Sequence, residues 1–256
     1  MFLQFIKRLF GKTLSLIEKN IPIRYLGSNY GGWYVAHENL SSNLIVFSAG
    51  AGEDISFDIE ILNNFQCKII IIIDPTPRAI QHIERVKKNL GKSKTLEYDQ
   101  VSGNQPVESY DLSKIKKSDF KVIHKALYNK SKSKIKFYEP SNKDFVSHSI
   151  SNYKNNYKTN TDFIEVSTIT LKEVMIENKI KNIDILKLDI EGAENKVLPQ
   201  ILRNKIFPKQ ILVEFDEINS SYVTPYLKAT YIIILLIMNK YKLIKTDKFP
   251  NFLFVR

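Results

Sequence analysis

The chain has 256 residues, of which 43% are hydrophobic and only nine each are glycine and proline, so a disordered or collagen-like chain is excluded. Its single cysteine, Cys67, excludes a disulfide framework and favours the reducing cytoplasm. The formal net charge of +11 favours anionic partners in general, and a lysine-rich coding bias explains it equally well. No apolar run reaches the roughly 18 residues that a transmembrane helix needs.

The first 43 residues are expected to pack on a core domain formed by residues 44–256. Apolar side chains at helical spacing within residues 1–20, beside three basic residues, predict an amphipathic helix. We expect this helix to pack on the domain, with a membrane or partner surface as the alternative. The turn-rich, aromatic segment 27–34 either forms an edge hairpin or folds over a cofactor.

A strand, a glycine-rich turn and a helix are predicted over residues 45–64. Gly50 and Gly52 follow an apolar run, where glycine lets the backbone approach a ligand and the next helix offers unpaired N–H groups. The next predicted strand, 69–73, ends in Asp74, 22 residues after Gly52. A carboxylate at that position can bind both hydroxyls of a ribose. The pattern therefore predicts a nucleoside-containing cofactor.

Helices and strands alternate along the rest of the chain. Pro77 and Gly91 bracket one predicted helix, and Thr170 with Glu173 forms a capping box for another. Residues 231–238 are strongly apolar and predict a buried helix. The other predicted elements are a hairpin or loop at 129–138, strands at 120–127, 163–169, 241–245 and 252–256, and strands that begin at Ile183 and Gln210.

Acidic residues gather at the predicted carboxyl ends of the strands. Strands alternating with helices predict an α/β fold: a Rossmann-like, doubly wound, seven-stranded, mostly parallel sheet whose final pair is close enough to be antiparallel. Such sheets bind ligands at the carboxyl ends of their strands. The acids at or next to these ends are Asp74, Asp189, Glu191, Glu214 and Asp216. Three acidic strand ends directed at one rim predict a functional site.

These motifs together resemble the FkbM family of S-adenosylmethionine-dependent methyltransferases. The resemblance rests on the turn 48–54, on Asp74-Pro75, and above all on Lys-Leu-Asp-Ile-Glu-Gly-Ala-Glu at 187–194. It implies a class I methyltransferase fold, S-adenosylmethionine as the cofactor, and O-methylation of a sugar or hydroxylated natural product. The expected partner is a small-molecule acceptor such as a sugar or nucleotide-sugar, and a homo-oligomer is left open.

The resemblance also assigns residues to the cofactor: Gly50, Gly52, Asp74, Pro75 and Ala126. The glycines would admit the cofactor, Asp74 would bind its ribose, and Ala126 would flank its adenine. Ser48 stands where most of these enzymes carry an acid that steadies the methionine end. We expect Glu53 or Asp54 to take that task.

Methyl transfer to a sugar hydroxyl needs a base or a metal ion, because the hydroxyl is a poor nucleophile at neutral pH. Asp189 and Glu191 are the predicted carboxylates of the reacting centre, and His148 is the predicted imidazole. Alternatively, Asp189 with Glu214 or Asp216 would bind a divalent cation through hard oxygen ligands.

Two other functions are weighed. A nicotinamide dehydrogenase is disfavoured because Ile55 stands where the third glycine of Gly-x-Gly-x-x-Gly belongs. An RNA methyltransferase is the alternative that fits the positive charge. The sequence shows no recognisable RNA-binding module and no basic-aromatic stripe, so nucleic acid is not the expected partner.

Overall fold

The computed structural model describes residues 2–40, 42–140, 148–152, 155, 158, 160–219, 222–247 and 250–256. Seven strands form one sheet in the order β11-β12-β10-β9-β3-β4-β5. They are β3 (Leu44–Ala49), β4 (Cys67–Ile73), β5 (Phe120–Ile123), β9 (Ile185–Leu188), β10 (Gln210–Glu214), β11 (Lys242–Asp247) and β12 (Asn251–Val255). The five from β10 to β5 are parallel, and β12 is antiparallel to both β10 and β11. The predicted doubly wound sheet with an antiparallel final pair is confirmed.

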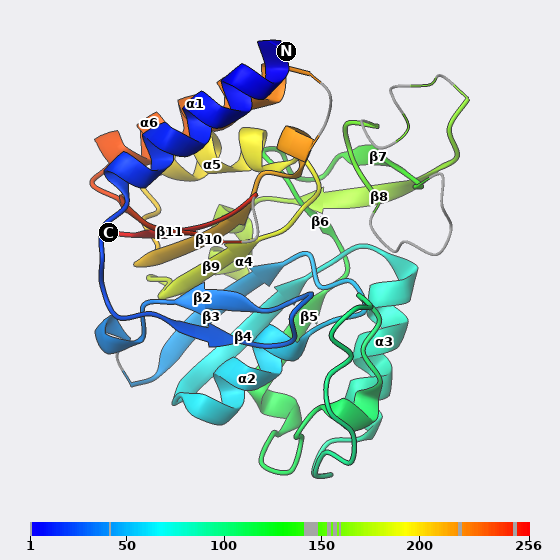
Figure 1. Ribbon diagram of the computed structural model, residues 1–256. Coiled ribbons are helices and arrows are strands. Elements are labelled where there is room, and N and C mark those ends of the chain that lie inside the picture. Colours follow the sequence, from blue (N-terminus) through cyan, green and yellow to red (C-terminus); the bar gives the residue numbers. More distant parts are fainter. Residues whose placement is uncertain are drawn as a thin grey trace.

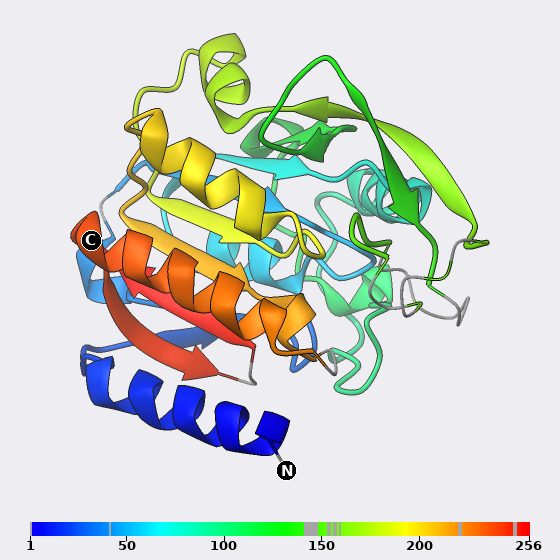
Figure 2. The ribbon, with the colours of Figure 1, turned by 90° about the horizontal axis from the view of Figure 1, so that it is seen from above.

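Helices cover both faces of this sheet. They are α1 (Phe2–Ile17), α2 (Ser56–Asn64), α3 (Pro77–Lys88), α4 (Leu171–Glu177), α5 (Glu194–Arg203) and α6 (Thr224–Met238). Figure 1 shows α1, α4, α5 and α6 on one side of the strands and α2 with α3 on the other. From above, in Figure 2, α1, α6 and α5 lie on the near side of the sheet. Each side has its own hydrophobic core.

The isoleucine run of β4 shows how one strand serves the cores on both faces of the sheet. Ile71 and Ile73 pack in the core beneath α5 and α6, whereas Ile70 and Ile72 pack toward α2 and α3. Alternate side chains of a strand point to opposite faces, so a strand covered on both faces favours apolar residues at successive positions.

A second, three-stranded sheet stands beside the main one and was not expected. β6 (Ala126–Leu127) pairs in parallel with β8 (Phe163–Ile169), which pairs antiparallel with β7 (Lys134–Tyr138). The predicted strand 120–127 is therefore wrong in length. Its first half is β5, and the Lys125 N–H then donates to the Ile123 carbonyl at 2.9 Å in a tight turn that leads directly into β6.

Helix α6 is apolar on its outer face as well as its inner one. The prediction of a buried helix at 231–238 is wrong for that outer face, where Tyr231, Ile234 and Met238 are exposed. The helix lies in the outer layer and packs only one side on the sheet (Figure 2), so the apolar residues on its other side stay uncovered. Among the described residues, no helix combines the length and apolarity needed to cross a membrane.

The aromatic lead-in forms an edge hairpin, as one of its two interpretations predicted. β1 (Arg24–Leu26) pairs antiparallel with β2 (Trp33–Val35). The hairpin is fastened to β10 by the Gln210 amide, which accepts from the Ala36 N–H at 2.9 Å and donates to the Ala36 carbonyl at 2.8 Å. Helix α1 contacts the core through Phe10, whose ring lies 5.5 Å from that of Tyr226. The division into residues 1–43 and 44–256 stays a prediction.

The glycine turn after β3 lies against the end of β9. Gly50 has φ +82°, and a Cβ added there would stand 1.7 Å from the Asp189 carbonyl oxygen. On the same turn, the Lys187 ammonium donates to the Gly50 carbonyl at 2.6 Å. Only glycine fits this contact, which brings the ends of β3 and β9 together.

We predict that Gly50→Ala destabilises the fold far more than Gly91→Ala does. Gly91 has φ +85°, and a Cβ added there meets no atom within 4 Å. The control therefore costs only the left-handed strain of about 1–2 kcal/mol. Gly50→Ala adds overpacking of about 1–3 kcal/mol. Urea unfolding of both variants measures the difference, and equal losses would contradict the role given to this contact.

Candidate functional site

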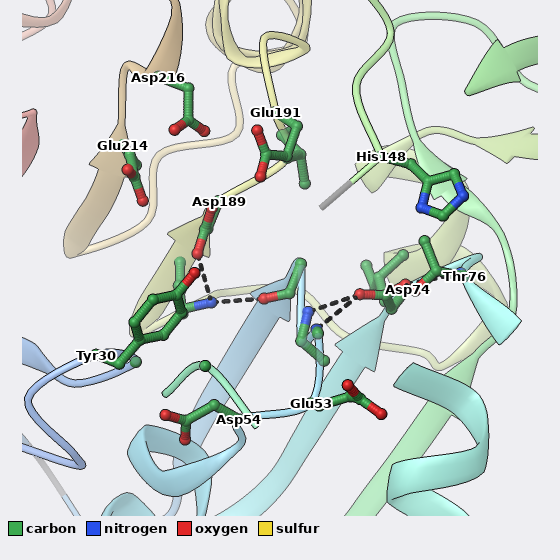
Figure 3. A pocket seen from close by; sticks show the side chains of 18 of the residues that line it. Tyr30, Glu53, Asp54, Asp74, Thr76, His148, Asp189, Glu191, Glu214 and Asp216 are labelled. Carbon is green, nitrogen blue, oxygen red and sulfur yellow. Dashed lines mark hydrogen bonds and ion pairs between the residues drawn. The ribbon is translucent and has the colours of Figure 1, made fainter. Parts of the chain in front are cut away.

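A pocket of about 580 Å³ opens at the carboxyl ends of β3, β4, β9 and β10 (Figure 3), a volume typical of small-molecule sites. It brings together almost all of the predicted site residues. Those that line it are Gly50, Gly52, Glu53, Asp54, Asp74, Pro75, Ala126, His148, Asp189, Glu191, Glu214 and Asp216. The exception is Ser48.

Asp74 holds the glycine turn in place. One carboxylate oxygen accepts from the N–H groups of Ala51 at 2.8 Å and Gly52 at 3.1 Å. The other accepts from the N–H of Thr76 at 2.8 Å and from its hydroxyl at 2.6 Å. A carboxylate offers about four lone-pair positions. A ribose hydroxyl binding to Asp74 would therefore have to replace one of these donors, and the rotatable Thr76 hydroxyl is the easiest to displace.

Glu53 and Asp54 are both engaged by protein groups. Glu53 is paired with the Arg78 guanidinium, and Arg85 lies 3.8 Å from its other oxygen. Asp54 accepts from the Ser28 hydroxyl at 2.6 Å and from the Ser56 N–H at 2.9 Å. Asp54 thereby fixes the turn between β1 and β2 against the start of α2. That either acid steadies a methionine group stays a prediction.

Ser48 lies beneath the pocket and faces α2. It is fully buried in β3, and it is not among the described residues that line the cavity. Below it lies Asp58, an acid of α2 that sequence reasoning missed. Burial raises the pKa of Asp58 to about 6, against the opposing effects of the Lys187 charge and the Ser48 hydroxyl. A buried acid thus stands near position 48 but comes from the helix.

Lys187 is a buried cation in the wall of the pocket. Its side chain is 5% exposed, and its ammonium lies 3.7 Å from an Asp189 carboxylate oxygen. The same ammonium donates to the Gly50 carbonyl and lies 5.7 Å from the centre of the Trp33 ring. A buried charge requires such partners. Lys187 therefore links the glycine turn to the carboxylates on the other side of the pocket, as the dashed lines of Figure 3 show.

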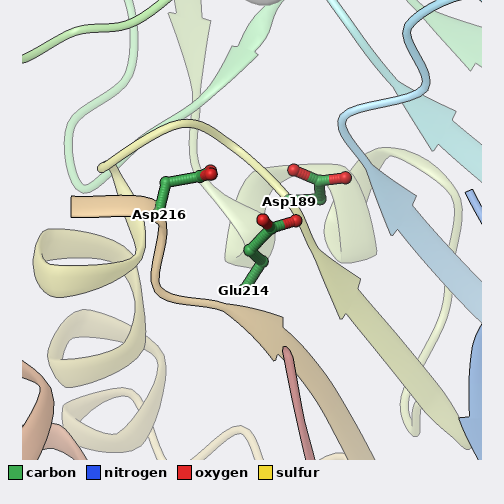
Figure 4. A group of neighbouring side chains, drawn as sticks. All are labelled: Asp189, Glu214 and Asp216. Carbon is green, nitrogen blue, oxygen red and sulfur yellow. The ribbon is translucent and has the colours of Figure 1, made fainter. Parts of the chain in front are cut away.

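Asp189, Glu214 and Asp216 form the acidic end of the pocket. Each offers an oxygen, and these oxygens all lie within 4.8 Å of one another (Figure 4). Burial, and secondarily the charge of Asp189, raises the pKa of Glu214 to about 8. This raised pKa favours the protonated form of Glu214, which relieves the repulsion between the three carboxylates. Asp189 is the more open acid, with a side chain 32% exposed.

The loop after β9 is shaped by a further carboxylate, that of Glu194. The buried Glu194 accepts from the N–H groups of Ile190 at 2.7 Å and Gly192 at 2.9 Å, and burial raises its pKa well above the usual value. Glu191 has a left-handed backbone, φ +55°, and the Ser149 hydroxyl donates to its carbonyl at 3.0 Å. This network directs the Glu191 side chain to the cavity.

His148 stands apart from the three-carboxylate cluster. Figure 3 shows its ring on the side of the pocket where β4 ends, with Glu191 between it and Asp189. Residues 141–147, 153, 154, 156, 157 and 159 lie outside the described residues. A catalytic role for His148 stays a prediction.

Two segments outside the strand-end motifs also line the pocket. Tyr30 comes from the turn between β1 and β2, so the lead-in both forms the hairpin and contributes to the pocket. Its ring packs on Gly103, where an added Cβ would lie 2.4 Å away. Residues 101–104 line the same flank. A small, polar turn without periodicity was the only sequence signal for them.

The model of the methyltransferase FkbM domain matches residues 49–230, most of the chain and nearly all of the pocket. The chain belongs to the FkbM methyltransferase family. No curated protein matches it.

Two solved structures are similar to this FkbM-family chain. One is the methyltransferase FkbM of Methylobacillus flagellatus KT, with a TM-score of 0.48 and 13% identity over 96% of this chain. The chain spans only 50% of that protein's length. The other is the precorrin-6y C5,15-methyltransferase of Geobacter metallireducens GS-15, with a TM-score of 0.41 and 10% identity over 85% of this chain and 82% of its own.

We predict that Glu214 makes the fold less stable as the pH rises. Its pKa of about 8 in the folded chain exceeds the ordinary 4.5, so between these values the folded state binds more protons and the free energy of unfolding falls with pH. Glu214→Gln removes this contribution to the pH dependence of the free energy of unfolding. Urea unfolding at the two ends of this range should therefore show a smaller loss for Glu214→Gln than for the wild type.

The control for this measurement is Glu97→Gln, which replaces a carboxylate with a side chain 84% exposed. It should lose stability in parallel with the wild type. If Glu214→Gln also ran parallel to the wild type, the carboxyl would be ionised in the folded chain and its assigned protonation would be wrong.

Proposed function

We propose that this chain is an S-adenosylmethionine-dependent O-methyltransferase acting on a hydroxyl of a small molecule, with a sugar as the preferred class. The observation that carries the proposal is the pocket itself, which has the glycine turn and Asp74 on one side and the Asp189 cluster on the other. Membership of the FkbM methyltransferase family supports a methyl donor of this kind.

The lining fits a nucleoside cofactor beside the turn. A Cβ added to Gly52 would meet no protein atom within 4 Å, so the turn leaves room for a ligand at the pocket wall. On this proposal the chain would hold the cofactor through Gly52, the Asp74-Pro75 corner and Ala126. When bound, S-adenosylmethionine supplies an electrophilic methyl group.

The residues at the acidic end would prepare the acceptor. The Asp189 carboxylate is the proposed base, because its side chain is open to the pocket and the raised pKa of Glu214 favours the protonated form of that neighbour. Lys187 would hold Asp189 in position through their 3.7 Å contact. Glu191 and His148 would position the acceptor or carry its proton away.

The acidic charge of the pocket lining favours one class of acceptor over another. Although the chain carries +11, seven carboxylates and a single lysine, Lys187, are among the described lining residues. Such a lining repels phosphate groups and accepts hydroxyls through hydrogen bonds. This favours an uncharged sugar over a nucleotide-sugar, and it disfavours the RNA alternative. We further propose that the chain acts in the cytoplasm, in keeping with its single free cysteine.

The function is tested first by titration calorimetry and then by turnover. S-adenosylhomocysteine should bind and NADH should not. Asp189→Asn should lower the rate of methyl transfer to a sugar by about 10²–10⁴-fold, because it removes the base, and leave the affinity for S-adenosylhomocysteine unchanged. The matched control is Asp184→Asn, at the opposite end of β9, which should keep turnover. Binding of NADH alone, or full turnover by Asp189→Asn, would contradict the proposal.

A divalent cation at Asp189, Glu214 and Asp216 is a subordinate proposal. Three carboxylate oxygens within 4.8 Å suit a hard cation, which would lower the pKa of an acceptor hydroxyl. The cation would first have to displace the proton of Glu214, so its affinity should rise with pH. We expect chelation by EDTA to lower turnover and Mg²⁺ to restore it. Turnover that survives exhaustive chelation would remove the cation from the reaction.

A further inference from the structure

Helix α6 presents a continuous apolar stripe to the outside. Leu227, Tyr231, Ile234 and Met238 recur at helical spacing and are 66%, 57%, 50% and 74% exposed. A helix in the outer layer ordinarily carries polar residues on its outward face. An apolar stripe of this kind on a solvent-exposed face marks an interaction surface.

Helix α1 extends the same surface. The Phe10–Tyr226 ring contact joins the two helices, and Figures 1 and 2 show both on the same side of the main sheet. Leu9 and Leu16 are 50% and 83% exposed. We call the outward sides of these two helices the α1–α6 face.

The charges around this face are almost all positive. Residues 2–19 contain Lys7, Arg8, Lys12 and Lys19 against one acid, Glu18. Residues 222–240 contain two lysines, Lys228 and Lys240, and no acid. One of them, Lys228, is neutralised by Glu217 at 2.9 Å. The apolar stripe is therefore bordered by cations, as in helices that lie in the interface of an anionic membrane.

We propose that the α1–α6 face docks on an anionic lipid surface, with the stripe entering the headgroup region and the flanking lysines and Arg8 contacting lipid phosphates. A second copy of the chain fits less well, because a two-fold interface would place these cations against each other. Tyr231 suits the membrane interface, where its ring and hydroxyl meet different surroundings.

Docking at this face would also bring the pocket near the membrane. Helix α6 follows the 3₁₀ turn Asp216–Asn219, which begins with the pocket residue Asp216. The Tyr226 hydroxyl donates to the Ile218 carbonyl at 3.0 Å and ties the first turn of α6 to that segment. An acceptor carried on a lipid could therefore be presented beside the acidic end of the pocket.

The test is co-sedimentation of the full chain with vesicles of phosphatidylcholine alone or with about 30 mol% phosphatidylglycerol. We expect binding to the anionic vesicles only, and weaker binding at high salt. Leu227→Gln/Ile234→Gln/Met238→Gln should lose it. Lys7→Gln/Arg8→Gln/Lys12→Gln should weaken it by about 100-fold, since each cation near the surface contributes about fivefold.

The matched control removes three exposed cations from the other side of the sheet, Lys88→Gln/Lys114→Gln/Lys117→Gln, and should bind like the wild type. Circular dichroism and thermal unfolding confirm folding, which these exposed positions should preserve. Lack of vesicle binding by the folded wild type would overturn the proposal. So would equal weakening by the control, or a dimer in solution that the Leu227/Ile234/Met238 variant converts to monomers, since that result gives the face to a second copy.

Discussion

The close contact between the ends of β3 and β9 is the constraint on which the site depends. Gly50 can approach the Asp189 carbonyl because it has no side chain, and the buried Lys187 ammonium bonds the Gly50 carbonyl across the same gap. The two halves of the pocket, the glycine turn and the carboxylate cluster, are thereby held at a fixed separation. A positioned cofactor and acceptor need such rigidity, because transfer between them depends on alignment.

Charge is distributed unevenly over the molecule, and this separates its two candidate surfaces. The pocket is lined by carboxylates, among which Asp189 is held by Lys187, Glu53 by Arg78 and Asp74 by backbone N–H groups. Apart from Lys187, the described cations do not line the pocket, and some of them border the α1–α6 face. The excess positive charge of the chain thus influences which surface it docks on. The acidic lining of the pocket influences which acceptor it binds.

Local patterns predicted the sheet and most of the pocket, because both follow from short-range rules. The capping box of Thr170 and Glu173 forms as predicted, and the acidic strand ends meet at one rim. What could not be predicted depends on contacts distant in sequence. Ser48 turns away from the pocket toward Asp58, and the saturated hydrogen bonds of Asp74 arise only when the turn folds. The exposure of the outer face of α6 could not be predicted, because a helix that is apolar on all sides gives no sign of which side faces solvent.

The central claim is that one pocket holds a nucleoside methyl donor at the glycine turn and directs its methyl group to Asp189. A crystal structure of the chain with S-adenosylhomocysteine tests this most directly. We expect the ribose at Asp74, the adenine beside Ala126 and the sulfur facing the Asp189 carboxylate. A nucleoside bound elsewhere, or a sulfur directed away from the carboxylates, would contradict the account.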